Sequence, residues 1–108
     1  HDKAKAYLSA MKSDLRNLVT AQESYIADFV TYTPTPEDSV PSPYDSIGAH
    51  RFHRFNTSTG VTITVGVATA TGWNATARHN GVAQTCGIFV GDAPSPMEGA
   101  SEGEPKCR

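Results

Sequence analysis

The first third of the chain repeats its apolar positions with the period of an α-helix. Between residues 1 and 33 these positions are Ala4, Leu8, Met11, Leu15, Leu18, Tyr25 and Phe29. Steps of three and four keep them on one face of a helix, and Gln22 is the one polar residue that interrupts the stripe. No proline or glycine occurs before Pro34, which cannot continue a helix. The pattern therefore predicts one long amphipathic helix that ends near residues 30–33.

Proline replaces this periodicity in the next segment, residues 34–49. Its sequence, PTPEDSVPSPYDSIGA, combines prolines with Thr, Ser, Asp and Glu. Proline restricts the backbone and suits turns, so the composition predicts a surface loop that stays extended. Tyr44 and Ile47 are the two side chains that could pin this loop to a core.

From residue 50 the period changes to two, which predicts β-strands. The clearest strand is residues 61–68, whose alternating apolar positions are Val61, Ile63, Val65 and Val67. Segments 50–56, 73–79 and 82–90 also fit strands, and Asn80-Gly81 is a strong hairpin signal. In the last two segments, one face is apolar and carries Trp73, Ala75, Ala77, Cys86, Ile88 and Val90. Connections this short imply a four-stranded antiparallel meander over residues 50–90.

Residues 91–108 show neither period and form a tail after the last predicted strand. Composition fits a single folded domain, with 38% hydrophobic and 19% charged residues. The formal charge of −2 gives no overall attraction to nucleic acid or anionic membranes. An even number of cysteines, Cys86 and Cys107, in a chain rich in Thr, Ser and Gly favours a disulfide bond and an oxidising compartment. Two unpaired thiols are the alternative.

One short segment has the composition of a nucleic-acid contact. Residues 50–55 interleave basic and aromatic side chains, which bind single strands by charge and stacking. Arg51, His53 and Arg54 are the candidate contacts. Because this is one short strand in an acidic chain, an ordinary edge strand with its Phe side chains in the core is the favoured interpretation.

The sequence contains no convincing metal site or catalytic motif. His50, His53 and His79 are the candidate metal ligands, but His50 and His53 would point to opposite faces of a strand, so surface histidines are the favoured interpretation. The acidic tail residues Asp92, Glu98, Glu102 and Glu104 could hold Ca²⁺, but a solvated acidic loop is favoured. There is no Gly-x-Ser-x-Gly, phosphate-binding Gly-Lys-Ser/Thr or His-Glu-x-x-His motif, so we expect no enzyme and no cofactor. Asn56 and Asn74 fit the glycosylation acceptor pattern, which arises readily by chance in a Thr-rich chain.

A long amphipathic helix, a surface loop, an antiparallel meander and a disulfide-closed C-terminal loop together resemble the globular part of a bacterial type IV pilin, or of the related type II secretion pseudopilins. The resemblance covers essentially the whole chain. It rests on AYLSAMKSDLRNLVTAQESYIAD with TYT, on GVTITV and GWNATARHNG, and on TCGIFVGDA with the ending GEPKC. It implies an α+β fold in which the N-terminal helix packs on a four-stranded antiparallel sheet.

The chain departs from this family at its front. Family members begin, after a prepilin peptidase site, with a long and very apolar segment that anchors them in the inner membrane and then packs in the filament core. Residues 1–108 contain no such segment. We therefore expect a truncated chain or processed ectodomain whose helix continues upstream, or a globular part made separately from its stalk. Membrane contact is expected only through that missing segment.

The resemblance implies a structural function. The chain would be the head of a pilus (fimbrial) filament subunit, displayed at the cell surface and located on the periplasmic side of the inner membrane before assembly. Its partners would be identical or related pilin subunits and the pilus assembly machinery. Residues in the first turns of the helix would overhang the sheet and contact neighbouring subunits: Asp2, Lys3, Lys5 and Tyr7. The alternatives are a type II secretion pseudopilin and a minor pilin that binds DNA or a surface, as in uptake or adhesion.

Overall fold

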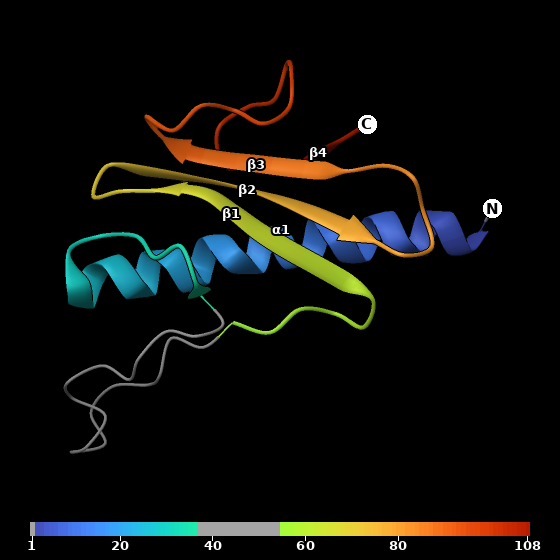
Figure 1. Cartoon of the computed structure of the whole chain (residues 1–108), viewed down its shortest axis with the longest axis horizontal. Helices are drawn as coiled ribbons and strands as arrows, with labels where there is room; N and C mark the ends of the chain where they lie inside the picture. Colours follow the sequence, from blue (N-terminus) through green and yellow to red (C-terminus); the bar gives the residue numbers. More distant parts are fainter. Residues whose placement is uncertain (1, 37–54) are drawn as a thin grey trace.

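One long helix lies across an antiparallel sheet in the computed structural model, which describes residues 2–36 and 55–108 (Figure 1). The helix α1 spans Asp2–Phe29. The strands are β1 (Val61–Ala68), β2 (Gly72–His79), β3 (Cys86–Gly91) and β4 (Lys106–Cys107). Most of the predicted proline-rich loop, with Tyr44 and Ile47, lies outside the described residues.

The helix is continuous, as its sequence pattern predicts. Met11, Leu15 and Leu18 are fully buried, because their spacing places them on the face that meets the sheet. The helix ends slightly earlier than predicted, at Phe29. Val30 follows with a φ of 65°, the left-handed conformation that commonly terminates helices. This turn directs residues 31–36 back along the helix.

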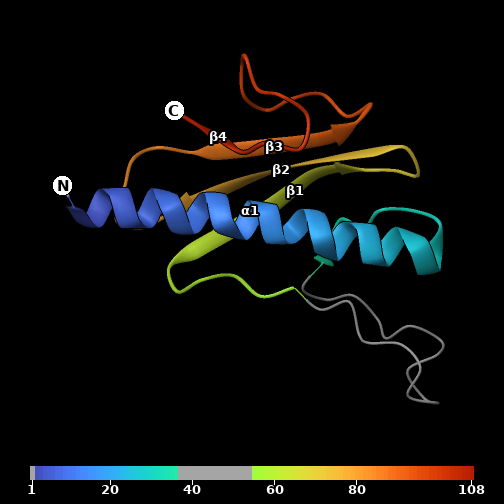
Figure 2. The same cartoon turned by 180° about the vertical axis from the view of Figure 1, so that it is seen from behind.

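The sheet is a four-stranded antiparallel meander in the order β1-β2-β3-β4, and it packs on α1 chiefly through β2 and β3 (Figure 2). The fold class and strand number match the prediction, but the strands are not the same four. Phe55 and Asn56, the described end of predicted strand 50–56, belong to no strand, and residues 50–54 lie outside the described residues. Instead, β4 comes from the tail and pairs with β3.

A β-bulge changes the side-chain pattern at the end of β1. The register shifts between Val65 and Val67, so that Val67 is 37% exposed and Ala68 turns toward the core. The predicted alternation is therefore correct at Val61, Ile63 and Val65 and wrong at Val67. A bulge inserts one residue and reverses the faces beyond it, and Gly66 stands at this one.

The core lies between α1 and the inward faces of β2 and β3. Trp73, Ala75, Ala77, Cys86 and Ile88 are buried there, and Val90 is partly buried beside them, as the alternation predicts. Small alanine side chains in the middle of β2 let the helix approach the sheet closely. Phe55, from the segment that precedes β1, is also buried in this cluster.

The tail forms a small second layer on the other side of β3. A Cβ atom added at Gly87 would lie 2.7 Å from Cγ of Pro96 and 2.9 Å from Cγ of Met97. Met97 and Ala93 are buried, although the sequence shows no period there. Only a glycine at position 87 allows the tail to pack this closely on the strand.

Candidate assembly surface

The predicted disulfide bond is present and joins Cys86, the first residue of β3, to Cys107, the last of β4. The two cysteines are register partners in the antiparallel pair. Thr85 and Arg108 extend this pair, because the N–H of each donates to the carbonyl of the other at 3.0 Å. The covalent bond therefore holds the tail where strand pairing also holds it.

A buried glutamine fixes the chain that leaves α1. Gln22 is fully buried, and its Nε2 donates to the carbonyl of Thr33 at 2.7 Å. Its Oε1 accepts from the N–H of the same residue at 2.9 Å. The side chain therefore satisfies both backbone groups of Thr33, as a neighbouring strand would. In the sequence, Gln22 was visible only as a polar residue in the apolar stripe, and its contact with Thr33 could not be predicted.

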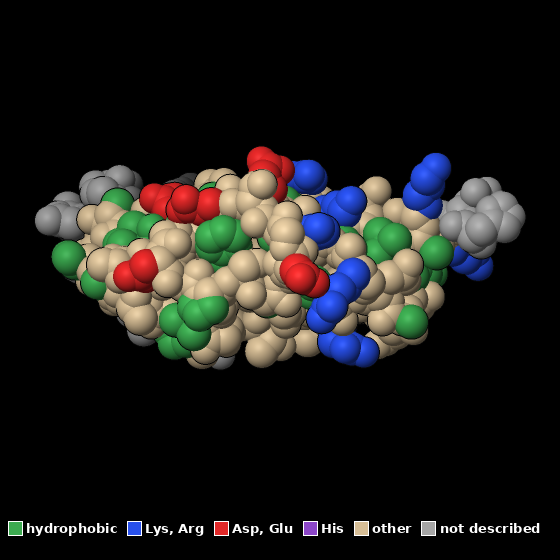
Figure 3. All heavy atoms as spheres, turned by 90° about the horizontal axis from the view of Figure 1, so that it is seen from above, with side chains coloured by type: hydrophobic (Ala, Val, Ile, Leu, Met, Phe, Trp, Pro, Cys, Tyr) green, Lys and Arg blue, Asp and Glu red, His purple; other side chains and the backbone are tan. Residues whose placement is uncertain are grey.

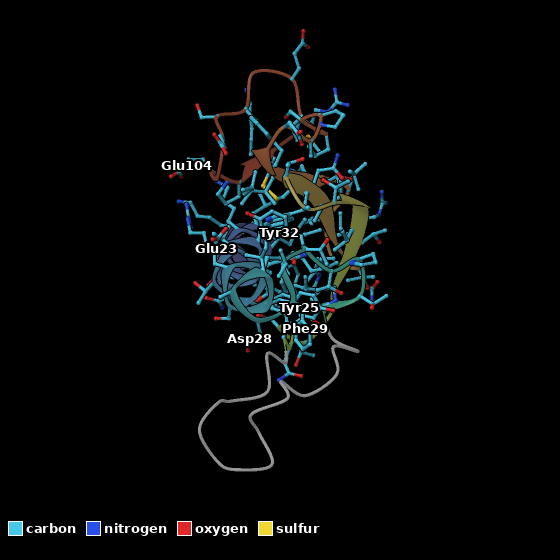
Figure 4. The ribbon with its side chains drawn as sticks, turned by 90° about the vertical axis from the view of Figure 1, so that its left-hand side faces the viewer. Glu23, Tyr25, Asp28, Phe29, Tyr32 and Glu104 are labelled. Atoms are coloured by element: carbon cyan, nitrogen blue, oxygen red, sulfur yellow. A yellow bond between two sulfur atoms is a disulfide. The ribbon has the colours of Figure 1, made fainter. Side chains whose placement is uncertain are left out.

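Next to this clamp, Tyr32 contacts the exposed side of α1. Its phenol donates to Oε2 of Glu23 at 3.0 Å, and its ring lies 6.4 Å from that of Trp73. Burial raises the pKa of Tyr32, and the hydrogen bond to Glu23 and the negative charges of Glu23 and Glu102 raise that pKa further. In Figure 4, Glu23, Tyr32 and Glu104 lie above Tyr25 and Phe29. This pair had no sequence signal, since its members lie on different segments.

The predicted contact residues of the first helical turns do not form one free surface. Tyr7 stacks on His79 at the end of β2, with ring centroids 3.9 Å apart and an interplanar angle of 16°. Nδ1 of His79 also accepts from the N–H of Gly81 at 2.8 Å. Tyr7 is therefore part of the packed domain and does not overhang the sheet. Lys3 and Lys5 are exposed.

The candidate nucleic-acid contacts Arg51, His53 and Arg54 lie outside the described residues, so their placement remains a prediction. Within residues 2–36 and 55–108, no group of three or more His, Cys, Asp or Glu side chains could hold a metal ion. In the same residues, no helix combines the length and apolarity needed to cross a bilayer.

The second glycosylation pattern falls on a side chain that is already engaged. Oδ1 of Asn74 accepts from the N–H of Val67 at the bulge, at 2.8 Å. Its Nδ2 donates to the carbonyl of Pro94 at 2.7 Å. Asn74 therefore links β1, β2 and the tail, and a glycan on Nδ2 would disrupt this link. Asn56 is exposed.

Comparison of the chain with protein-family models and with curated proteins finds no match. The fold and its surfaces are therefore the basis for the functional proposal.

Proposed function

We propose that this chain is the globular head of a type IV pilin-like filament subunit. The observation that carries the proposal is the relation between α1 and the rest of the fold. At about 1.5 Å per residue, the helix is about 42 Å long. It extends along a molecule whose longest dimension is 48 Å, and only one of its faces packs on the sheet (Figure 2).

In this function α1 acts as a rod that carries the head. A helical spine continuous with α1 would supply most of the association energy between subunits, because it would bury extensive apolar surface in the filament core. The sheet and the disulfide-closed tail would then face outward.

The proposal is tested on filaments from the cells that produce the chain. Filaments are sheared from the cell surface and purified, and their subunits are identified by peptide mass spectrometry. An antibody raised against this chain is used for immunogold labelling of the same filaments. We expect peptides of this chain in stoichiometric amounts and gold along the filament length.

Two other results would reject the pilus subunit. Labelling that remains in the inner membrane fraction, together with loss of protein secretion on deletion of the gene, would indicate a pseudopilin. Rare labelling at filament tips, together with loss of DNA binding on deletion, would indicate a minor subunit.

A further inference from the structure

Most of the charged residues that the structure describes are sorted along the long axis of the molecule, although Asp2 begins α1 and the buried Asp14 lies near the middle of the helix. The basic ones lie toward the end where α1 begins, and they are Lys3, Lys5, Lys12, Arg16, Arg78, Lys106 and Arg108. Exposed carboxylates mark the opposite end, and they are Glu23, Asp92 and Glu102. In Figure 3, Lys and Arg side chains lie in the centre and on the right, while Asp and Glu side chains lie in the centre and on the left. We call these two surfaces the basic end and the acidic end.

The topology of the fold produces this sorting from segments far apart in sequence. Arg78 lies near the end of β2, which is antiparallel to the start of β3. Arg108 pairs with Thr85, just before β3, and so joins the basic end. At the other end of β3, Asp92 follows the strand, and Glu102 accepts from the N–H of Gly91 at 2.6 Å.

At the acidic end, two of the carboxylates accept hydrogen bonds from neutral hydroxyl donors. Glu23 accepts from the phenol of Tyr32, and Asp92 accepts from the hydroxyl of Thr71 at 2.8 Å. Like charges gathered at one end repel each other in an isolated molecule. The order of charges along α1 does not favour the isolated helix either. Its last turn contains no basic residue, whereas cations stabilise that position.

We propose that the acidic end binds the basic end of a second copy of this chain, so that copies associate head to tail. This inference rests on the proposed function, because a contact between two different surfaces repeats along a filament. It goes beyond that function by naming the two surfaces of the head that meet. The complementary charges orient the encounter and fix which ends join.

One stripe of α1 shows how successive copies could align. Lys5, Lys12, Arg16 and Glu23 are spaced by seven, four and seven residues, so they lie on one side of the helix. A copy shifted along the direction of α1 brings its Lys5 toward Glu23 of the copy before it. The same shift brings the start of β3 in one copy toward the end of β3 in the other.

Sedimentation velocity of the isolated chain tests this contact over a range of concentrations. We expect weak self-association at about 20 mM NaCl that weakens roughly tenfold at about 300 mM, because salt screens exposed charges. Two double variants then alter one end each. Lys5→Glu with Arg16→Glu lowers the charge of the basic end from +7 to +3, and Glu23→Lys with Asp92→Lys changes the charge of the acidic end from −3 to +1. Each double variant alone is expected to associate more weakly than the unchanged chain at low salt.

The decisive measurement is an equimolar mixture of these two double variants, in which opposite charges can meet again. We expect association at least as strong as that of the unchanged chain. Glu98→Lys with Glu104→Lys is the matched control. It changes the net charge by the same amount as Glu23→Lys with Asp92→Lys, but it alters exposed carboxylates of the tail that are not assigned to the acidic end. This control should associate like the unchanged chain, and circular dichroism should show every variant folded.

Several results would overturn the inference. These are a monomeric chain at low salt, double variants that associate as the unchanged chain does, or a mixture that fails to associate. Binding of the basic end to vesicles that contain anionic phospholipid, without self-association, would identify a membrane surface as the partner instead. If the chain is found in filaments but the charge variants assemble normally, the proposed function stands and this inference fails.

Discussion

At the residue scale, the clamp of Gln22 on Thr33 explains how the chain turns back after α1. A polar side chain in an apolar stripe is costly unless its hydrogen bonds are satisfied, and here both ends of the amide are. The clamp replaces a helix continuation that Pro34 forbids. Position 22 is therefore specified by the backbone of Thr33 and not by the packing of the helix on the sheet.

Replacement of this glutamine by an apolar side chain should destabilise the domain strongly. Gln22→Leu would leave the buried N–H and carbonyl of Thr33 unsatisfied, and we expect a loss of about 2–3 kcal/mol in the free energy of unfolding. Chemical denaturation followed by circular dichroism measures this loss. Asn17→Leu, on the exposed side of the same helix, is the control and should change the free energy by less than about 0.5 kcal/mol. Equal effects of the two substitutions would contradict a clamp.

The raised pKa of Tyr32 predicts a loss of stability in alkaline solution. The folded state favours the neutral phenol, because burial and the nearby Glu23 disfavour the tyrosinate. A group with a raised folded pKa stabilises the fold fully below its unfolded pKa, about 10 for tyrosine. That contribution disappears as the pH rises through the higher folded pKa.

Denaturation at a series of pH values from about 8 to 11 measures this linkage. In Tyr32→Phe, the loss of stability at alkaline pH should be smaller, because the contribution of the Tyr32 phenol is removed. Glu23→Gln should also make this alkaline loss of stability smaller, because Glu23 is one cause of the raised pKa of Tyr32. Tyr25→Phe is the control for the loss of a tyrosine hydroxyl from another position. An identical pH dependence in Tyr32→Phe and the unchanged chain would show that Tyr32 does not contribute.

At the scale of elements, the tail is a structural part of the sheet and not an appendage. It supplies β4, buries Met97 over Gly87, and donates the N–H of Gly103 to the carbonyl of Phe89 at 2.8 Å. The disulfide bond closes this unit at the start of β3. Strand pairing, a small apolar layer and one covalent bond thus hold the same segment.

Removal of the disulfide bond should loosen the tail before it unfolds the domain. The double variant Cys86→Ala with Cys107→Ala removes the bond. For a loop of this length, the chain-entropy model gives a loss of about 3 kcal/mol in the free energy of unfolding. Hydrogen exchange should increase first at the amides of Arg108 and Gly103. The first donates to the carbonyl of Thr85, just before β3, and the second to the carbonyl of Phe89 in β3. The amides of the β1–β2 pair serve as the internal reference. Uniformly faster exchange across all strands would instead indicate that the tail and sheet unfold together.

Periodicity in the sequence was sufficient to predict α1, β2 and β3, because each has one buried face that repeats regularly. It could not predict β4, since two residues are too short to show a period. It failed at Val67 because a bulge shifts the register there, and the N–H of Val67 donates to the side chain of Asn74, its register partner on β2 and seven residues further along the chain. The Cys86–Cys107 pair followed from counting cysteines, whereas the two charged ends required the topology that brings Arg78, Arg108 and α1 together.

At the scale of the whole molecule, the described surface offers charge but little apolar area for association. Among the described residues, the large hydrophobic side chains that stand exposed are Val30, at 76%, and Val67, at 37%. Stable interfaces usually need a contiguous, well-packed apolar centre. Complementary ends without such a centre give orientation and salt dependence more than affinity.

The isolated chain should therefore not form a tight oligomer of fixed size. We expect a dissociation constant of roughly 10 μM or weaker for self-association at physiological salt, because opposite charges on exposed side chains contribute only weakly when screened. Sedimentation equilibrium across a wide range of protein concentrations measures this constant. Val30→Ser is the control for the exposed apolar side chain and should leave the constant unchanged. A stoichiometric oligomer that survives high salt, or one that Val30→Ser dissociates, would show that the head itself carries the assembly interface. A spine continuous with α1 would then not be needed to explain polymerisation.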